Sequence, residues 1–375
     1  MKLLFVTTGL NIGGAERALH AIIDNGLGEK YSIKIISLRD SGHFGENFKL
    51  DGIDVYCLNL QNPFNLFFGL IKAFNFARKF EPDVIQGWMY HGNIFSLLFG
   101  SITRVKPKVY WGIRQTLYDI RKEKVLTQLI IRLGAQLSFL ADGIIYNSKK
   151  SQNQHESRGF SKKNSIYIPN GFDLTKWKPD AEERKVLRNE LEIPDKSFVI
   201  GYIGRFHQMK NIELLFEVMK SVLSENPNSI FLIVGKNTDR ENLKLKYLYE
   251  QLPSQQVLSL GVRVDIPAVV QCMDLLCLTS AWGEAFPNVI GEAMASGIPC
   301  VATDIGDCAL VIGETGWIIP PNNAELLANC INEALTESTS VHNLRSVAAK
   351  KIISQNYNIT NIVNNYSNVY LYNQI

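Results

Sequence analysis

TSAWGEAFPNVIGEAMASGIPCVATD, residues 279–304, is the stretch from which the fold of this chain can be read. Two apolar runs of strand length border its centre, DLLCL at 274–278 and IPCVA at 298–302. Between them apolar side chains recur at helical spacing. Pro287 suits the first turn of that helix and Gly297 suits its end. The pattern predicts strand, loop, helix and strand, a unit in which ligands bind where the strand gives way to the helix.

The start of this predicted helix favours phosphate oxygens, because its first N–H groups have no partner within the helix. Glu284 lies in the preceding loop, and Glu292 lies one turn inside the helix with its side chain leaning back toward the start. A carboxylate at that position suits vicinal hydroxyls, such as those of a ribose. The alternative interpretation is two solvated surface acids. As a pair beside a phosphate-binding turn, they indicate hydroxyl acceptors more than a hydrolytic pair.

The spacing from Glu284 to Glu292, with FPNV inside it and EAMASGIPCVATD after it, resembles that of the retaining glycosyltransferases of family 4. The resemblance implies an α/β fold of two facing Rossmann-like domains, the GT-B arrangement, with a cleft between them. It also implies that Glu284 lies near the donor sugar and that Glu292 holds the ribose. The residues expected to hold the sugar and diphosphate between these two acids are Phe286, Pro287, Asn288 and Val289.

Composition indicates a globular protein of a reducing compartment. Of its 375 residues 46% are hydrophobic and 20% are charged. The six cysteines form no CxxC motif and mostly lie in apolar runs, which predicts buried free thiols. The formal net charge of +3 is too small to indicate nucleic-acid binding. Residues 1–8 read as a first strand rather than a signal peptide, and no run approaches the roughly 20 apolar residues of a membrane span. A cytoplasmic location is expected.

The first half opens with a buried strand at residues 2–8 and a glycine-rich turn that contains Gly13 and Gly14. Their spacing is not that of the dinucleotide-binding GxGxxG motif. In family 4 the matching GGAER loop closes over the cleft near the donor phosphate. The resemblance therefore implies that both glycines contact the donor.

A further strand is predicted at 84–88, shortly before His91. Family 4 members usually carry histidines just after this strand, one of them close to the anomeric carbon of the donor. Here Gln86 and Trp88 stand where a histidine could be expected, and His91 alone remains. It is expected at the reacting centre, with a structural histidine as the alternative.

The second half opens a new strand–helix alternation at Ser197. Its first strand is followed by Gly204, Arg205 and Lys210, on a strand-to-helix loop that suits an anion: arginine gives a forked contact and lysine a point charge. Plain surface charge is the alternative. In family 4 the matching cations neutralise the donor diphosphate. After the next strand the family often has a second glycine, where this chain has Lys236-Asn237. Arg263 matches the family's loop beside the nucleotide base, uracil or guanine.

The expected domains follow from these motifs and from the family's IPNGVD link, here IPNGFD. Residues 1–172 form an acceptor-binding Rossmann-like domain and 173–196 a linker. Residues 197–355 form the nucleotide-sugar-binding Rossmann-like domain. Residues 356–375 are expected to form a helix that crosses back onto the first domain.

Thirteen basic residues lie between Arg104 and Lys163, against four acids. Within this region Val125–Leu140 reads as an amphipathic helix, and the earlier run Phe64–Phe80 is also apolar over much of its circumference. Core helices with a solvated face are one interpretation. A surface that docks on anionic lipid at the inner face of the cell membrane is the other.

The resemblance implies transfer of a hexose or N-acetylhexosamine from a nucleoside diphosphate sugar to a glycan acceptor with retention of configuration, and a UDP-sugar is the expected donor. A lipid-linked acceptor and a role in surface polysaccharide or O-antigen assembly are expected. The residues expected to act in catalysis are His91, Glu284, Arg205 and Lys210. The chain shows no DxD after a strand and no His/Cys cluster at ligand spacing, so neither a metal nor another cofactor is expected.

Two other classes of protein stay open. A nucleotide-sugar epimerase shares the two-domain shape, but it needs acids and a histidine arranged for proton abstraction, which the sequence does not show. A catalytically silent nucleotide-sugar-binding subunit would keep Glu292 and lose Arg205 or Lys210, and both cations are present.

Overall fold

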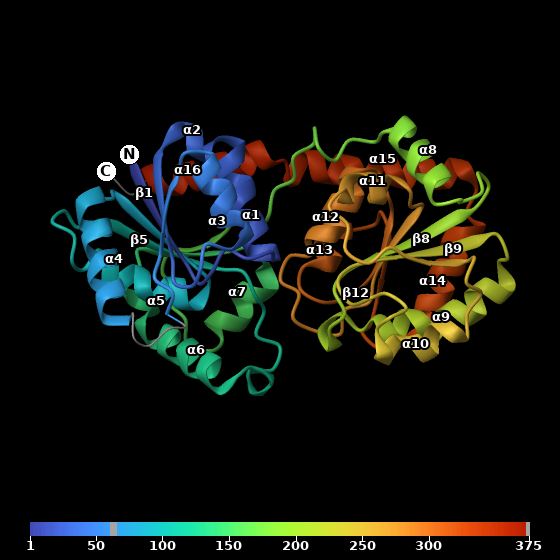
Figure 1. Cartoon of the computed structure of the whole chain (residues 1–375), viewed down its shortest axis with the longest axis horizontal. Helices are drawn as coiled ribbons and strands as arrows, with labels where there is room; N and C mark the ends of the chain where they lie inside the picture. The colour runs from blue at the N-terminus through green and yellow to red at the C-terminus, as the bar shows by residue number, and fades with distance from the viewer. Residues whose placement is uncertain (61–65, 373–375) are drawn as a thin grey trace. The chain divides into compact units, whose positions relative to one another are not determined.

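The computed structural model describes residues 1–60 and 66–372, which form two compact units (Figure 1). Unit 1 comprises Met1–Gly171 and Ile359–Ile375, and unit 2 comprises Phe172–Asn358. Each unit has a parallel sheet with helices between successive strands, because a parallel pair needs a crossover connection that a helix supplies. The α/β class predicted from the alternating pattern is confirmed. None of the helices in the described part of the chain is both long and apolar enough to cross a membrane.

The sheet of unit 1 has a switch in strand order at its centre. Its strands, from one edge to the other, are β3 (Asp54–Cys57), β2 (Ser32–Ser37), β1 (Lys2–Thr7), β4 (Val84–Trp88), β5 (Lys108–Ile113), β6 (Gly143–Tyr146) and β7 (Ser165–Tyr167). β1 and β4 pair from Leu3 opposite Val84 to Thr7 opposite Trp88. Because the chain moves outward in opposite directions from this pair, their carboxyl ends border the crevice where such sheets bind ligands.

The helices of unit 1 connect these strands. They are α1 (Gly14–Ile22), a π-helical turn (Ile23–Leu27), α2 (Gly28–Lys30), α3 (Gly42–Leu50), α4 (Leu66–Phe80), α5 (Met89–Gly100), a 3₁₀ turn (Ile120–Lys122), α6 (Val125–Leu137), a second 3₁₀ turn (Ser138–Leu140), α7 (Lys149–Glu156) and α16 (Ile359–Tyr372). The helix expected from Phe64 is observed from Leu66, and its first two expected residues lie outside the described residues. The amphipathic run expected at Val125–Leu140 is helical throughout, with its last turn in 3₁₀ form.

Helix α16 belongs to unit 1, although it follows all of unit 2 in the sequence. Its Tyr366 and Tyr370 are buried in the core beside β1 and β4. The Tyr370 hydroxyl donates to Gln86 Oε1 at 3.0 Å, and the Tyr110 hydroxyl donates to the Val369 carbonyl at 3.1 Å. The end of the chain therefore completes the core of its first half.

A buried histidine makes unit 1 sensitive to acid. The Tyr90 hydroxyl lies 2.8 Å from His155 Nε2, and His155 Nδ1 lies 2.8 Å from the Ser151 carbonyl, so Nδ1 carries the proton and Nε2 accepts. Burial lowers the pKa of His155 to about 4, against 6.5 for a free imidazole. The unfolded chain therefore binds this proton more tightly than the folded one. The neutral, buried imidazole therefore stabilises the folded state fully above pH 6.5. That stabilisation, about 3 kcal/mol of the free energy of unfolding, is lost as the pH falls toward 4.

We expect the free energy of unfolding, measured in urea, to fall between pH 7 and pH 4.5 more steeply in the wild type than in a His155→Gln variant. Glutamine cannot take up the proton, so the variant keeps only the pH dependence of the other groups. Identical slopes for the two proteins would contradict the assignment.

The sheet of unit 2 has the same kind of switch. Its strands, from one edge to the other, are β10 (Val257–Ser259), β9 (Ser229–Val234), β8 (Phe198–Ile203), β11 (Leu275–Leu278), β12 (Cys300–Thr303) and β13 (Trp317–Ile319). Its helices are α8 (Ala181–Glu190), the 3₁₀ turn Gln208–Lys210, α9 (Ile212–Glu225), α10 (Leu243–Glu250), α11 (Ile266–Gln271), α12 (Asn288–Ala295), α13 (Cys308–Ile312), α14 (Ala324–Thr336) and α15 (Thr339–Asn356). The switch falls between β8 and β11.

The stretch 279–304 folds as predicted, as the loop, helix and strand that follow β11. Pro287 is the N-cap of α12 rather than a residue of its first turn. Gly297 ends the helix with a φ of +80° and donates to the Met294 carbonyl at 3.0 Å, while Ile298 donates to the Ala293 carbonyl at 2.9 Å. These two hydrogen bonds are those of a glycine-terminated helix end.

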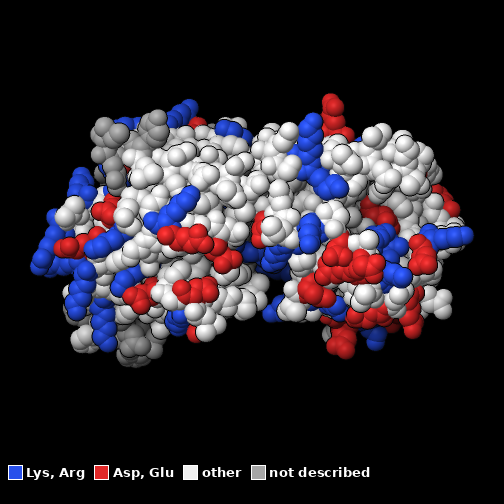
Figure 2. Space-filling model, turned by 90° about the horizontal axis from the view of Figure 1, so that it is seen from above, with Lys and Arg blue, Asp and Glu red and all other residues white. Residues whose placement is uncertain are grey.

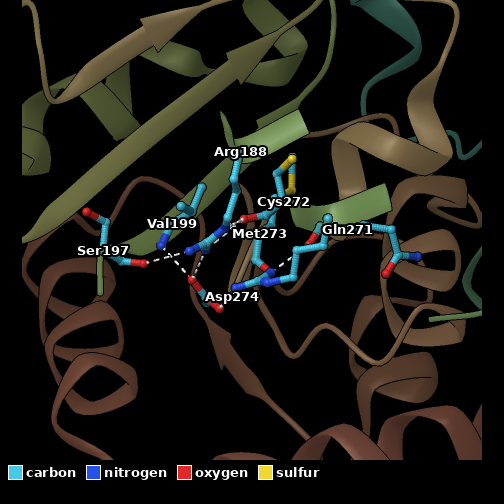
Figure 3. A network of polar contacts seen from close by, with 8 residues as sticks. Arg188, Ser197, Val199, Gln271, Cys272, Met273 and Asp274 are labelled. Atoms are coloured by element: carbon cyan, nitrogen blue, oxygen red, sulfur yellow. Dashed lines mark hydrogen bonds and ion pairs between the residues drawn. The ribbon is translucent and has the colours of Figure 1, made fainter. Parts of the chain in front are cut away.

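The segment 173–196, predicted as a linker, is part of unit 2 and contains α8, whose Arg188 belongs to the polar network of Figure 3. Two arginines of α8 bind one carboxylate: Arg184 lies 2.6 Å from Asp274 Oδ1, and Arg188 lies 2.7 Å from Oδ2. The Val199 N–H donates to the same Oδ2 at 2.8 Å. Asp274 immediately precedes β11 and Val199 lies near the start of β8. The network therefore fastens α8 to the amino ends of these strands.

Candidate active site

The carboxyl end of β8 continues into a short loop that carries the predicted cations. His207 opens the 3₁₀ turn Gln208–Lys210, and its Nδ1 accepts a hydrogen bond from the Met209 N–H at 3.1 Å. Asn211 then takes a left-handed conformation, with a φ of +45°, from which α9 begins. The loop keeps Lys210 partly buried and leaves Arg205 exposed.

Lys210 and Glu284 form an ion pair that joins the loops after β8 and β11, at the switch in strand order. The Ser280 hydroxyl donates to the same Glu284 oxygen at 2.7 Å. Only 17% of the lysine side chain and 11% of the glutamate side chain are exposed. Burial alone raises the pKa of Glu284, but the charge and hydrogen bond of Lys210, the Ser280 hydroxyl and the charge of Arg205 outweigh it and hold that pKa below its usual value. Glu284 is therefore a carboxylate at neutral pH.

Backbone contacts fix how these two loops meet. The Ala281 N–H donates to the Met209 carbonyl at 2.8 Å, and the Thr279 hydroxyl donates to the Lys210 carbonyl at 2.9 Å. Gly283 has a φ of +84°, and a Cβ at this position would lie 2.3 Å from Met209 Sδ. Glycine is thus favoured just before Glu284, because another residue would be strained at this positive φ and its Cβ would displace the Met209 side chain.

The loop after β12 supports Glu284 from another direction. Gly306 has a φ of +59°, and an added Cβ would lie 2.5 Å from the Glu284 carbonyl oxygen. The Asp307 N–H donates to the Ala285 carbonyl at 2.9 Å, and the Thr303 hydroxyl donates to the Ser280 carbonyl at 2.6 Å. Three consecutive loops of the sheet therefore hold the carboxylate in place.

Helix α12 starts four residues after Glu284. No side chain caps it, and Phe286 and Pro287 just before it are buried. Its first residues, Asn288 and Val289, present the helix end that attracts phosphate oxygens. Glu292, one turn further on, is only 4% exposed. The loop and helix together bring a cation, two carboxylates and a helix start to one edge of the unit 2 sheet.

Arg263, expected beside the nucleotide base, pairs with an acid of its own loop. Its Nε donates to Asp265 Oδ1 at 2.7 Å, and its other guanidinium nitrogens reach Asp265 Oδ2 and Glu190. Its charge is therefore offset within unit 2.

In unit 1 the predicted residues gather at the carboxyl ends of β1 and β4. Gly13 is the N-cap of α1 and Gly14 its first residue. A Cβ on Gly13 would lie 2.3 Å from a Glu16 carboxylate oxygen, so that side chain folds back over the start of its own helix. Trp88, the last residue of β4, donates through Nε1 to the Ala15 carbonyl at 2.9 Å. This hydrogen bond links the glycine loop to the strand that precedes His91.

His91 lies in the first turn of α5, which begins in a sharp turn. Met89 has a φ of +67°, which is a strained conformation for a residue with a side chain. A Cβ on Gly92 would lie 2.2 Å from the Val6 carbonyl oxygen, so this helix starts directly against β1. Burial, followed by the charge of Arg39, lowers the pKa of His91. The imidazole is therefore neutral at pH 7.

Sequence reasoning missed the residues that support the site. The sequence alone assigns no role to Ser280, Met209, Gly283, Thr303 or Gly306. The one available signal was the glycine directly before Glu284. Within residues 1–60 and 66–372, no group of three or more His, Cys, Asp or Glu side chains is placed to hold a metal ion.

Comparison with known proteins places these features in a family. The family model for Glycosyltransferase Family 4 matches residues 12–176, and that for Glycosyl transferases group 1 matches residues 183–351. A UDP-Gal:alpha-D-GlcNAc-diphosphoundecaprenol alpha-1,3-galactosyltransferase of Escherichia coli is 31% identical over 208 residues, which are 54% of this chain and 53% of that protein. The chain thus spans about half the length of this relative.

Two further proteins match over more of their length. The capsular polysaccharide biosynthesis glycosyltransferase CapM of Staphylococcus aureus is 25% identical over 301 residues, 76% of this chain and 77% of that protein. The crystal structure of HepE of Anabaena in complex with UDP matches with a TM-score of 0.85 and 23% identity over 98% of this chain and 99% of that one. This likeness shows a shared fold, the GT-B arrangement of two parallel-sheet domains.

Since the two family models between them match nearly all of both units, the chain belongs to the family 4 glycosyltransferases, with a group 1 domain as its second half.

Proposed function

We propose that this protein is a retaining glycosyltransferase, which moves a hexose or N-acetylhexosamine from a nucleoside diphosphate sugar to a glycan acceptor. The observation that carries the proposal is the Lys210–Glu284 pair at the switch between β8 and β11, with the start of α12 in the same loop. A diphosphate needs cations and unpaired amides, whereas a sugar needs carboxylates that accept from its hydroxyls. This edge of the sheet supplies both.

The reaction makes the diphosphate a leaving group. As the bond from the anomeric carbon to the phosphate oxygen breaks, negative charge grows on the phosphate. Arg205, Lys210 and the first amides of α12 stabilise that charge. The acceptor hydroxyl attacks the anomeric carbon from the same side, its proton passes to the departing phosphate oxygen, and the configuration is retained. Glu284 orients the sugar, Glu292 holds the ribose and His91 steadies the reacting centre.

The names of the relatives support a particular donor and acceptor. HepE was crystallised with UDP and with UDP-glucose, and the E. coli relative is named for transfer from UDP-Gal to GlcNAc-diphosphoundecaprenol. CapM is named for capsular polysaccharide synthesis. We therefore propose a UDP-sugar donor, a lipid-linked glycan acceptor, and a role in surface polysaccharide or O-antigen assembly.

Incubation with a panel of nucleotide sugars, with and without a lipid-linked GlcNAc diphosphate acceptor, tests this function. A transferase elongates the acceptor and releases the nucleoside diphosphate, and NMR of the product should show the donor's anomeric configuration. An epimerase would convert the sugar without acceptor, and a silent subunit would do neither. An inverted product would overturn the retaining mechanism.

We also propose that no divalent metal takes part, because Arg205, Lys210 and the start of α12 supply the positive charge that a metal would bring to the diphosphate. The transfer rate should therefore be unchanged by EDTA, and added magnesium or manganese should not raise it. Loss of activity in EDTA that either ion restores would count decisively against this proposal.

We propose that unit 1 docks on the anionic inner face of the cell membrane. The supporting observation is the exposed apolar face of α6. Val125, Leu129 and Leu133 recur every fourth residue on one face, and their side chains are 73%, 54% and 41% exposed. Lys124, the N-cap of this helix, and Arg132 within it are also exposed. An apolar stripe beside cations suits a lipid surface, where the diphosphate of a lipid-linked acceptor would lie.

The division of charge between the two units supports docking through unit 1 rather than unit 2. Unit 1 holds 22 Lys and Arg against 13 Asp and Glu, a formal net charge of +9, whereas unit 2 holds 17 against 23, a net charge of −6. Figure 2, which shows one face of the molecule, has blue and red side chains on both units, with several red side chains together on unit 2. An anionic surface therefore attracts unit 1 and repels unit 2.

We expect the protein to sediment with anionic vesicles at low salt, and far less at high salt, since each cation near the surface is worth about 1 kcal/mol and is screened beyond a Debye length. A Leu129→Ser/Leu133→Ser variant should bind less. Leu243→Ser, which changes an 85% exposed leucine in unit 2, serves as the matched control. Equal binding to neutral and anionic vesicles, or none at low salt, would leave α6 as an ordinary surface helix.

A further inference from the structure

The loops after β8 and β9 bring two cations into register. The two strands pair in parallel up to Ile203 opposite Val234. The ladder continues beyond the strands, because the Phe206 N–H donates to the Lys236 carbonyl at 2.9 Å. Arg205 and Lys236 each lie two residues beyond the last strand pair, so they stand directly opposite each other.

Backbone contact holds this register. Gly235 has a φ of +150°, and an added Cβ would lie 2.0 Å from the Gly204 carbonyl oxygen, so the two loops touch. Asn237 takes the left-handed conformation, with a φ of +59°, that a glycine usually adopts. Asn237 therefore has a glycine-like conformation at the place where the family often has a second glycine, and Lys236 adds a cation there.

Both cations are exposed, and neither has a hydrogen-bonded or ion-paired side-chain partner within the described residues. The neighbouring cations differ in this respect, since Lys210 is paired with Glu284 and Arg263 with Asp265. Like charges directly opposite each other on adjacent strands repel. An anion between Arg205 and Lys236 relieves that repulsion.

We infer that Lys236 binds the donor diphosphate together with Arg205. The inference rests on the proposed function and names a residue for the same site. Each phosphate of the donor carries a negative charge, while the charge of Lys210 is largely offset by Glu284. Arg205, the partly offset Lys210 and the start of α12 therefore leave negative charge on the diphosphate to be balanced, and Lys236 supplies a further cation beside Arg205.

Calorimetric titration with UDP, and with uridine as a probe that lacks phosphates, tests the inference. We expect Lys236→Ala to weaken UDP binding about tenfold, as for a lost hydrogen bond to a charged group, and to leave uridine binding unchanged. The affinity of Lys236→Arg for UDP should stay within threefold of the wild-type affinity. The loss in Lys236→Ala should shrink as salt is raised, because exposed charges are screened.

Lys220→Ala, which removes an exposed lysine from the middle of α9, is the matched control and should bind UDP like the wild type. Melting temperatures of all variants show whether they are folded. Equal UDP affinity in Lys236→Ala and wild type, or an equal loss for uridine, would overturn the inference while leaving the proposed function standing. A wild type that binds none of UDP, GDP or ADP would instead overturn the proposed function itself.

Discussion

Replacing Arg205 by alanine is expected to lower kcat/KM for sugar transfer by about two orders of magnitude or more. The guanidinium is the unpaired cation of the β8 loop, and its charge reaches Glu284 strongly enough to lower the pKa of that carboxyl, after the larger effects of burial, Lys210 and Ser280. Losing a charged donor to a leaving diphosphate costs roughly 2–4 kcal/mol of transition-state stabilisation.

Initial rates over a range of donor concentrations, at fixed acceptor, give this ratio. Arg205→Lys should fall between wild type and Arg205→Ala, because lysine keeps the charge but loses the forked contact. Lys220→Ala should match the wild type. If kcat/KM of the Arg205→Ala enzyme were within threefold of the wild-type value, Arg205 would not be a residue of the donor site.

The largest effect on stability is expected from Asp274→Asn. This change leaves Arg188, whose side chain is only 7% exposed, without its counter-charge, and weakens the hold of Arg184 as well. Burial lowers the pKa of Arg188, and the charge of Asp274 acts in the opposite direction. Breaking a buried ion pair by removing one partner costs about 3–5 kcal/mol, so unit 2 should unfold at a clearly lower denaturant concentration.

Urea unfolding followed by tryptophan fluorescence measures this loss. Lys49→Ala is the control, because its ion pair with Glu46 is exposed on α3, with 44% and 60% of the two side chains accessible. Exposed pairs contribute little, so the control should leave the urea concentration at the midpoint of unfolding almost unchanged. A similar small loss in Asp274→Asn would show that α8 is fastened by other contacts.

The sequence was sufficient where the signal was local. The strand–loop–helix–strand unit of residues 279–304 could be predicted because its apolar spacing, Pro287 and Gly297 all act within a few residues of each other. The positions of Arg205, Lys210 and Glu284 on strand-to-helix connections, and of Glu292 inside the following helix, could be predicted from the same kind of pattern. The pattern does not reveal which strands become neighbours in the sheet. That strand order creates the switch between β8 and β11.

The rest depends on contacts between distant residues. Lys210 and Glu284 are 74 positions apart, so the sequence predicts a role for each of them but not the ion pair that joins them. Met209 against Gly283 is a steric fit that no spacing rule reveals. The register that sets Arg205 opposite Lys236 likewise requires the pairing of β8 with β9. The segment 173–196 has the composition of a charged linker. Its place in unit 2 depends on Asp274, about 90 positions away, which binds two of its arginines.

A crystal structure with bound UDP tests the central claim most directly. The account predicts diphosphate oxygens within hydrogen-bonding distance of Arg205, Lys210 and the backbone N–H groups that start α12, with the ribose hydroxyls on Glu292. A nucleotide bound with its ribose away from Glu292, or at another edge of the unit 2 sheet, would contradict it.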